Sequence, residues 1–262
     1  MFGSRTQKTT QKYEQVAKKT YTWRSSDKAF VYYDSEKKER VALPKGAKLI
    51  PLTTTNSVTG NRERDHGRAT ARWNLVSSNE FTDYRNENIK VVEYDRLDKS
   101  RTVVFEGTYS GEIRDAISGL AWANFTKNIY CLYDGEVIKL ALSKAGLTAW
   151  IEFEDKLKET NTYLTDGHCI YLDKAKECTT GMVKYFAPVF GVGDISEEDN
   201  KKADEVAEKV EEALARNQAA LASRDSSAPA QVEVPAAPQT ETATTETVNS
   251  AEDTVSLEEI PF

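Results

Sequence analysis

The sequence has few of the side chains on which enzymes most often depend. Among its 262 residues are two histidines and three cysteines. The segment DGHC at 166–169, with Cys178 beyond it, lacks the paired C-x-x-C spacing of a zinc site. No phosphate-binding loop, G-x-S-x-G elbow or H-E-x-x-H motif is present. We therefore expect a protein that is not an enzyme, with no catalytic residue, no metal and no cofactor.

Long apolar runs are also missing. No window approaches the roughly eighteen apolar residues of a membrane span. The first twenty residues are basic but lack the apolar centre of a secretory signal, and the odd number of cysteines does not indicate a disulfide framework. We expect a cytoplasmic protein with no membrane partner.

Aromatic residues and positive charge are both scarce at the end of the chain. After Gly193 the only aromatic residue is Phe262. Residues 1–193 carry 30 Lys and Arg against 25 Asp and Glu, whereas residues 194–262 carry 5 against 17. This asymmetry predicts a basic folded body that binds an anion such as nucleic acid, joined to an acidic tail.

The pattern of the body is that of strands. Asp134-Gly135 between two apolar runs predicts a tight hairpin over 129–142. A helix is expected over 143–159, with Trp150 and Phe153 in the core, and a long polar loop over 53–71. Further β-branched and aromatic runs predict strands at 28–33, 72–76, 89–94, 101–109 and 182–190, the last an edge strand or a bulge because Pro188 cannot donate to a ladder.

These elements indicate a mainly β fold, and we expect an OB-like β-barrel with helical additions. Strand count alone does not separate such a barrel from a sandwich. The expected organisation is a basic N-terminal arm over 1–20, an OB-like domain over 21–193, a helix over 196–222, a disordered linker over 223–255 and a docking tip over 256–262.

The predicted helix over 196–222 has a Ser cap, acids in its first turn and a narrow apolar stripe. Two interpretations stay open for this stripe. The helix lies loosely on the barrel, or it associates with a second copy to give a homo-oligomer. The linker that follows lacks aromatic residues and cannot bury enough apolar area to offset its chain entropy.

The chain ends in SLEEIPF, an apolar tripeptide behind two carboxylates. Pro261 holds Ile260 extended, and Phe262 carries both a ring and the terminal carboxylate, so a partner needs an apolar pocket with a basic rim. Glu258 and Glu259 would speed encounter with that rim. An acidic tail that only maintains solubility is the alternative, but it does not account for the final Ile-Pro-Phe.

This end resembles that of bacterial single-stranded-DNA-binding proteins (SSBs), whose acidic tail closes with Ile-Pro-Phe. The resemblance implies that the tip docks replication and repair proteins. It is confined to the end of the chain, and the body shows none of the core sequence of that family. A phage or mobile-element SSB with a diverged barrel fits both observations.

Aromatic residues beside Lys or Arg occur repeatedly in the body. Single-strand binders combine such cations with aromatic platforms, because stacking contributes about 1–3 kcal/mol per base without reading sequence. The loop over 53–71 adds arginines that could close over a phosphate backbone. The candidate DNA-binding residues are Lys28, Tyr32, Tyr33, Arg62, Arg64, Arg68, Arg72, Trp73, Tyr84 and Arg85.

We therefore predict a protein that binds and protects single-stranded DNA during replication or recombination and recruits partners through its tip. One alternative is an adaptor or inhibitor that displays an SSB-like tip without binding DNA. A weaker alternative is a metal-dependent nuclease or recombination factor.

Overall fold

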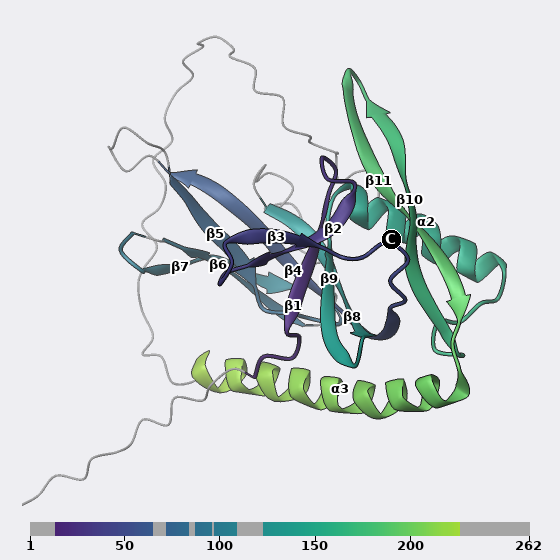
Figure 1. Cartoon of the computed structure of the whole chain (residues 1–262). Coiled ribbons are helices and arrows are strands. Elements are labelled where there is room, and N and C mark those ends of the chain that lie inside the picture. The colour runs from purple at the N-terminus through teal and green to yellow at the C-terminus, as the bar shows by residue number, and fades with distance from the viewer. Residues whose placement is uncertain (1–13, 65–71, 84–86, 96, 109–122, 226–262) are drawn as a thin grey trace, which may run out of the picture.

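The computed structural model describes residues 14–64, 72–83, 87–95, 97–108 and 123–225, with only the main chain at 63–64, 72–73 and 221–225. These residues form eleven strands and two helices (Figure 1). In chain order they are β1 (Lys19–Arg24), β2 (Ala29–Asp34), β3 (Glu39–Ala42), β4 (Ile50–Arg64), β5 (Arg72–Ser78), β6 (Asn88–Tyr94), β7 (Arg101–Thr108), β8 (Ala123–Tyr133), β9 (Glu136–Leu142), α2 (Ala145–Glu159), β10 (His168–Thr180), β11 (Val183–Asp194) and α3 (Glu197–Asp225).

Nine strands form one sheet in the order β3-β2-β1-β9-β8-β4-β5-β6-β7. All neighbours are antiparallel except β1 and β9, which run parallel. Strands β3 and β7 end this order and do not pair with each other, so the sheet is open among the described residues. The mainly β class is confirmed, whereas the strands do not close into the expected barrel.

Local sequence explains most of these elements. Asp134 and Gly135 have φ angles of 50° and 73° and join β8 to β9, as a two-residue turn with two positive φ angles requires. The strands expected at 28–33, 72–76, 89–94, 101–109 and 182–190 and the helix expected over 143–159 are confirmed to within a few residues at each end.

The polar loop expected over 53–71 is wrong for its first twelve residues, which belong to the fifteen-residue strand β4. Val58 of β4 is buried in an apolar cluster, while Thr55 and Ser57 lie on the opposite face of the sheet, where they are also buried. A run of Thr and Val favours a strand. It reads as a loop because one face of this strand is polar.

Helix α2 covers the apolar face of the sheet. Its residues Leu147, Trp150, Phe153 and Leu157 recur at helical spacing and are all buried. Trp150 packs edge-on against Phe190 at 5.1 Å between ring centroids. Strands β1, β2, β8 and β9 supply the other side of this core, which confirms the expectation that Trp150 and Phe153 are core residues.

Strands β10 and β11 form a separate two-stranded ribbon that projects from the sheet (Figure 1). One bridge between Leu49 and Ile170 attaches the ribbon to the rest of the fold. The main chain of Phe186 adds hydrogen bonds to the side chains of Trp23 and Ser25 at 2.7 and 2.6 Å. Pro188 lies in this ribbon, in agreement with the expected edge position.

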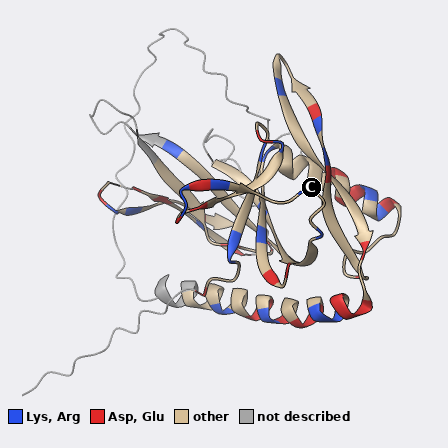
Figure 2. Cartoon of the chain, in the orientation of Figure 1, with Lys and Arg blue, Asp and Glu red and all other residues tan. Residues whose placement is uncertain are grey.

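Helix α3 begins after an N-cap serine. Ser196 Oγ accepts a hydrogen bond from the Asp199 main chain at 3.1 Å and donates one to its carboxylate at 2.7 Å. The stripe predicted for this helix is buried at Ala203, Val210 and Ala213, and the helix packs on β4. Its outer surface mixes acidic and basic residues (Figure 2). Neither described helix is long and apolar enough to cross a bilayer.

Candidate nucleic-acid interface

A cleft of about 870 Å³ lies on the face of the sheet opposite α2. Its floor comes from β4 to β9, and its walls are the C-terminal half of α3 and the segment 14–17 that leads into β1. The alternation of strands places one set of side chains here and the apolar set under α2. The residues used below are Leu75, Lys90, Val92, Tyr94, Arg101, Tyr130, Lys139 and Gln218.

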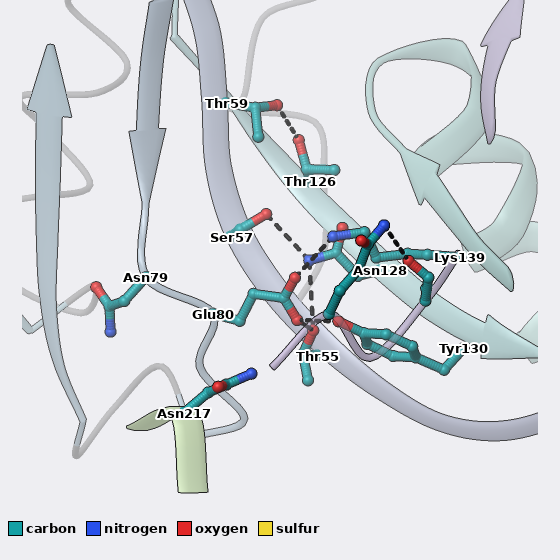
Figure 3. A network of polar contacts seen from close by, with 12 residues as sticks. Thr55, Ser57, Thr59, Asn79, Glu80, Thr126, Asn128, Tyr130, Lys139 and Asn217 are labelled. Carbon is teal, nitrogen blue, oxygen red and sulfur yellow. Dashed lines mark hydrogen bonds and ion pairs between the residues drawn. The ribbon is translucent and has the colours of Figure 1, made fainter. Parts of the chain in front are cut away.

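The inner part of the floor is a polar network centred on Glu80 (Figure 3). The Glu80 carboxylate accepts hydrogen bonds from Thr55 Oγ1 at 2.6 Å and from the Tyr130 hydroxyl at 2.7 Å. Lys139 Nζ forms an ion pair with the same carboxylate at 2.8 Å. Gln218 of α3 donates to the main-chain oxygen of Glu80 at 3.4 Å, which ties the helix to this floor.

The position of Glu80 is fixed by its neighbour in the chain. Phe81 is fully buried, and its main chain pairs with Asn56 of β4 through two hydrogen bonds of 2.7 and 2.9 Å. Glu80 is therefore held against β4 although it lies outside the named strands. Burial raises the pKa of Tyr130 well above its usual range, and the Glu80 carboxylate raises it further. Tyr130 thus donates to Glu80 as a neutral phenol.

Further polar side chains continue the network along β4 and β8, beyond the residues that line the cleft. Asn128 donates to Thr55 at 3.3 Å and to Ser57 at 3.1 Å, and all three are buried. Thr59 and Thr126 share a hydrogen bond of 2.6 Å between their hydroxyls. Each of these buried groups has a partner, as buried polar groups require.

The outer part of the floor, on β5, β6 and β7, is apolar and cationic. Leu75 is 40% exposed, and Val103, which lies just beyond the lining residues and pairs with Val92 in the ladder, is 46% exposed. The Arg101 guanidinium lies over the Tyr94 ring at 5.9 Å from its centroid. Among the described residues Arg101 forms no ion pair. This part of the cleft can therefore offer an aromatic face, apolar contacts and a cation to one ligand.

Cations outnumber carboxylates on this floor. Lys139 is paired with Glu80, and Lys90 lies 3.9 Å from Glu106 at the outer edge. Arg101 adds a third cation, which forms no ion pair with a carboxylate of the described residues. Such a surface suits an anionic chain that carries planar groups.

Four of the candidate DNA-binding residues have described side chains, and none of them lines the cleft. Lys28 lies over the Phe186 ring at 3.8 Å in the β1–β2 turn. Tyr32 packs edge-on against Tyr21 at 5.1 Å, while Tyr33 is 62% exposed. Arg62 pairs with the buried carboxylate of Glu93 at 3.4 Å. The structure does not bring these four residues together at the cleft.

The remaining candidates are not described at the level of side chains. The main chain of Arg64 pairs with that of Arg72, and Trp73 pairs with Glu63, where β4 and β5 meet. Arg68, Tyr84 and Arg85 lie outside the described residues, as does the whole docking tip, Glu258, Glu259, Ile260, Pro261 and Phe262.

Sequence reasoning missed the cleft residues Tyr94, Arg101 and Lys139. Tyr94 stands in the segment EYDR, where the aromatic and cationic residues were visible. The contact between Tyr94 and Arg101 could not be seen in the sequence, because it depends on the ladder between β6 and β7. Lys139 reads as an ordinary exposed strand residue until β9 is placed beside β8.

No group of three or more possible metal ligands occurs among the described residues. No family model, curated protein or solved structure matches this chain.

Proposed function

We propose that the protein binds single-stranded DNA in the cleft, without strong sequence preference, and recruits replication or repair proteins through its C-terminal tip. The observation that carries this proposal is the pair of Tyr94 and Arg101 beside the exposed Leu75 and Val103. Bases released from a duplex expose faces that stack on aromatic rings, and their phosphates require cations. A duplex keeps those faces covered.

Strand connectivity supports an OB-like origin for this surface. Strands β4, β5, β6 and β7 follow one another as hairpins, and β8 returns to lie beside β4, giving the order β8-β4-β5-β6-β7. The return of a later strand to the side of the first is the feature of a Greek key, here with one additional hairpin strand, and OB barrels are Greek-key barrels. In this chain β1 pairs with β9 and extends the sheet beyond that motif.

The tip provides the second half of the proposal. Its Ile-Pro-Phe terminus follows Glu258 and Glu259 in a tail of strong negative charge. An apolar pocket with a basic rim would bind this sequence, and the segment between α3 and the tip would let the tip reach a partner while the body stays on DNA.

The test is fluorescence-anisotropy titration of a labelled oligo-dT with the full chain and with Tyr94→Leu. Loss of one stacked base weakens binding by about 1–3 kcal/mol, or roughly 5- to 150-fold. Tyr33→Leu is the matched control, because Tyr33 is more exposed and lies on β2 away from the cleft. Equal affinities for the two variants would refute the cleft as the binding site.

A chain that does not bind oligo-dT at all would leave the tip as the functional element and favour the adaptor. Cleavage of the oligonucleotide on addition of Mg²⁺ would favour the nuclease.

A further inference from the structure

The ribbon of β10 and β11 has two faces with different surroundings (Figure 1). On β11, Phe190 packs against Trp150 of α2, and Phe186 contacts Lys28 of the β1–β2 turn. Because side chains alternate along a strand, the even-numbered residues of β11 form this face and the odd-numbered ones form the opposite face. We call the opposite face the Tyr171 face, and from β10 it carries Tyr171, Lys174 and Lys176, which pair with odd-numbered residues of β11.

The two lysines of the Tyr171 face are exposed. Lys174 and Lys176 form no ion pair with any residue that the structure describes. Lys184, which lies on the other face of the ribbon, binds Glu177 at 2.9 Å. Asp173 occupies the irregularity of the ladder beside Lys174, and it also forms no ion pair within the described part of the chain. Two cations on this face are therefore available to an anionic ligand.

Tyr171 lies flat on the ribbon because two glycines leave room for its ring. A Cβ atom on Gly191 would stand 2.5 to 2.8 Å from Cζ, Cε2 and Oη of Tyr171, which is closer than real Cβ contacts. A Cβ atom on Gly193 would stand 3.6 Å from Cε1, on the other side of the same ring. The ring therefore lies along β11, and one of its faces rests on that strand. Tyr171 is partly exposed and belongs to neither apolar cluster, so solvent reaches the other ring face.

We propose that the Tyr171 face of the ribbon is a second contact surface for single-stranded DNA, on which a base stacks against Tyr171 and phosphates bind Lys174 and Lys176. This inference rests on the proposed function, since the ligand is the single strand whose other nucleotides occupy the cleft. An aromatic ring face beside unpaired cations is the combination that single-strand binding uses.

The spacing of the two lysines suits this ligand. They are two residues apart in one strand, or about 7 Å, which is comparable with the distance between neighbouring phosphates of an extended single strand. A strand bound at both the cleft and the ribbon is held more tightly than at either surface alone, because the second contact is intramolecular.

The first experiment measures the affinity for a long labelled oligo-dT from 50 to 200 mM salt. It compares the full chain with the variant Lys174→Gln, Lys176→Gln. Because each phosphate contact adds about 0.7 to the salt slope on single strands, the slope should be shallower by about 1.4, and the difference in affinity should narrow about sevenfold across the series. The matched control is Lys201→Gln, Lys202→Gln, which removes the same charge from exposed positions of α3. Equal slopes for the two double variants would overturn the inference.

The second experiment tests the ring at constant salt. Tyr171→Leu should weaken binding roughly 5- to 150-fold, the loss of one stacked base. Tyr171→Phe keeps a ring over Gly191 and should bind as the natural chain does, because stacking does not need the hydroxyl. Tyr163→Leu is the matched control, since Tyr163 is 64% exposed and lies outside both the ribbon and the cleft. Equal losses for Tyr171→Leu and Tyr171→Phe, or no loss for either, would overturn the stacking on Tyr171.

The outcomes separate this inference from the proposed function. If Tyr94→Leu weakens binding and the ribbon variants do not, the inference is overturned and the cleft is supported. If the ribbon variants weaken binding and Tyr94→Leu does not, the ribbon is supported and the cleft is refuted as the binding site. A chain that does not bind oligo-dT at all would overturn both.

Discussion

The two helices cover opposite faces of one sheet with different chemistry. Helix α2 presents Trp150, Phe153 and Leu157 to an apolar cluster that includes Ile129 and Phe190, and Leu147 to a second cluster that includes Val58. Of the α3 side chains that the structure describes, those fully buried are the small ones Ala203, Val210 and Ala213. It stands over a floor on which Thr55, Ser57, Asn128 and Tyr130 bond to one another and to Glu80.

The difference separates stability from function. The hydrophobic contribution to stability increases with the apolar area buried and needs no particular partner, so the α2 face supplies much of it. The α3 face depends on specific hydrogen bonds, each of which contributes about 0.5–1.5 kcal/mol net. Its surface tolerates water and charge, and it opens into the cleft. We infer that the apolar face stabilises the sheet and the polar face is kept for a ligand.

The largest expected effect tests this asymmetry directly. Trp150→Ala removes a side chain that is 1% exposed and packs against Phe153 and Phe190, and it should lower the free energy of unfolding by about 3–5 kcal/mol. Val210→Ala, also buried, removes two methyl groups from the α3 side and should cost about 1–2 kcal/mol. Chemical denaturation of both variants measures the difference. Equal losses would mean that α3 contributes as much as α2.

The sequence predicted the α2 face better than the α3 face, for a physical reason. Trp150 and Phe153 are recognisable as core residues because apolar side chains at helical spacing usually form the buried face of a helix. The polar side chains of β4 led to the prediction of a loop, since Thr and Ser occur in strands as well as in loops. Only the sheet order, which places β8 beside β4, shows that Asn128 meets Thr55 and Ser57.

The sequence predicted the type of surface at the candidate site but not the residues that form it. Aromatic residues next to cations indicated a nucleic-acid surface, yet adjacency in the chain selected Tyr32 and Tyr33 rather than Tyr94. Neighbours along a strand point to opposite faces, whereas Tyr94 and Arg101 meet across a ladder. Pairings of this kind depend on register and cannot be read from a single strand.

The next largest effect is a loss of stability at alkaline pH, to which a buried tyrosine on each face of the sheet contributes. Tyr130 has a raised pKa from burial and from Glu80, so it favours folding below its ordinary pKa near 10, and this contribution is lost as pH rises above 10. At pH 11 the loss should be about 1.4 kcal/mol relative to neutral pH. Tyr130→Phe should remove this part of the alkaline destabilisation, as measured by urea unfolding at pH 8 and pH 11.

Tyr21, on the apolar side, gives the comparison. Burial and the nearby Tyr32 raise the pKa of Tyr21 to about 12. Tyr21→Phe should therefore make the free energy of unfolding fall less steeply between pH 10 and 12. Glu80→Gln distinguishes the two tyrosines. It should lower the pKa of Tyr130 toward its usual range, and it should leave unchanged the loss of stability at alkaline pH that comes from Tyr21. If Tyr130→Phe leaves the alkaline loss of stability unchanged, Tyr130 does not have the raised pKa of a buried phenol.

The smallest effect concerns one hydrogen bond on the polar face. Thr126→Val leaves the hydroxyl of Thr59 without its partner at 2.6 Å, and because Thr126 is 2% exposed the expected cost is about 1 kcal/mol. The double variant Thr59→Val, Thr126→Val removes both hydroxyls and should recover most of that loss, since two apolar groups of similar shape need no partner. Denaturant unfolding of the three variants measures the coupling. Additive losses would mean that the threonines do not act as a pair, and the polar face would then owe its stability to the network around Glu80 alone.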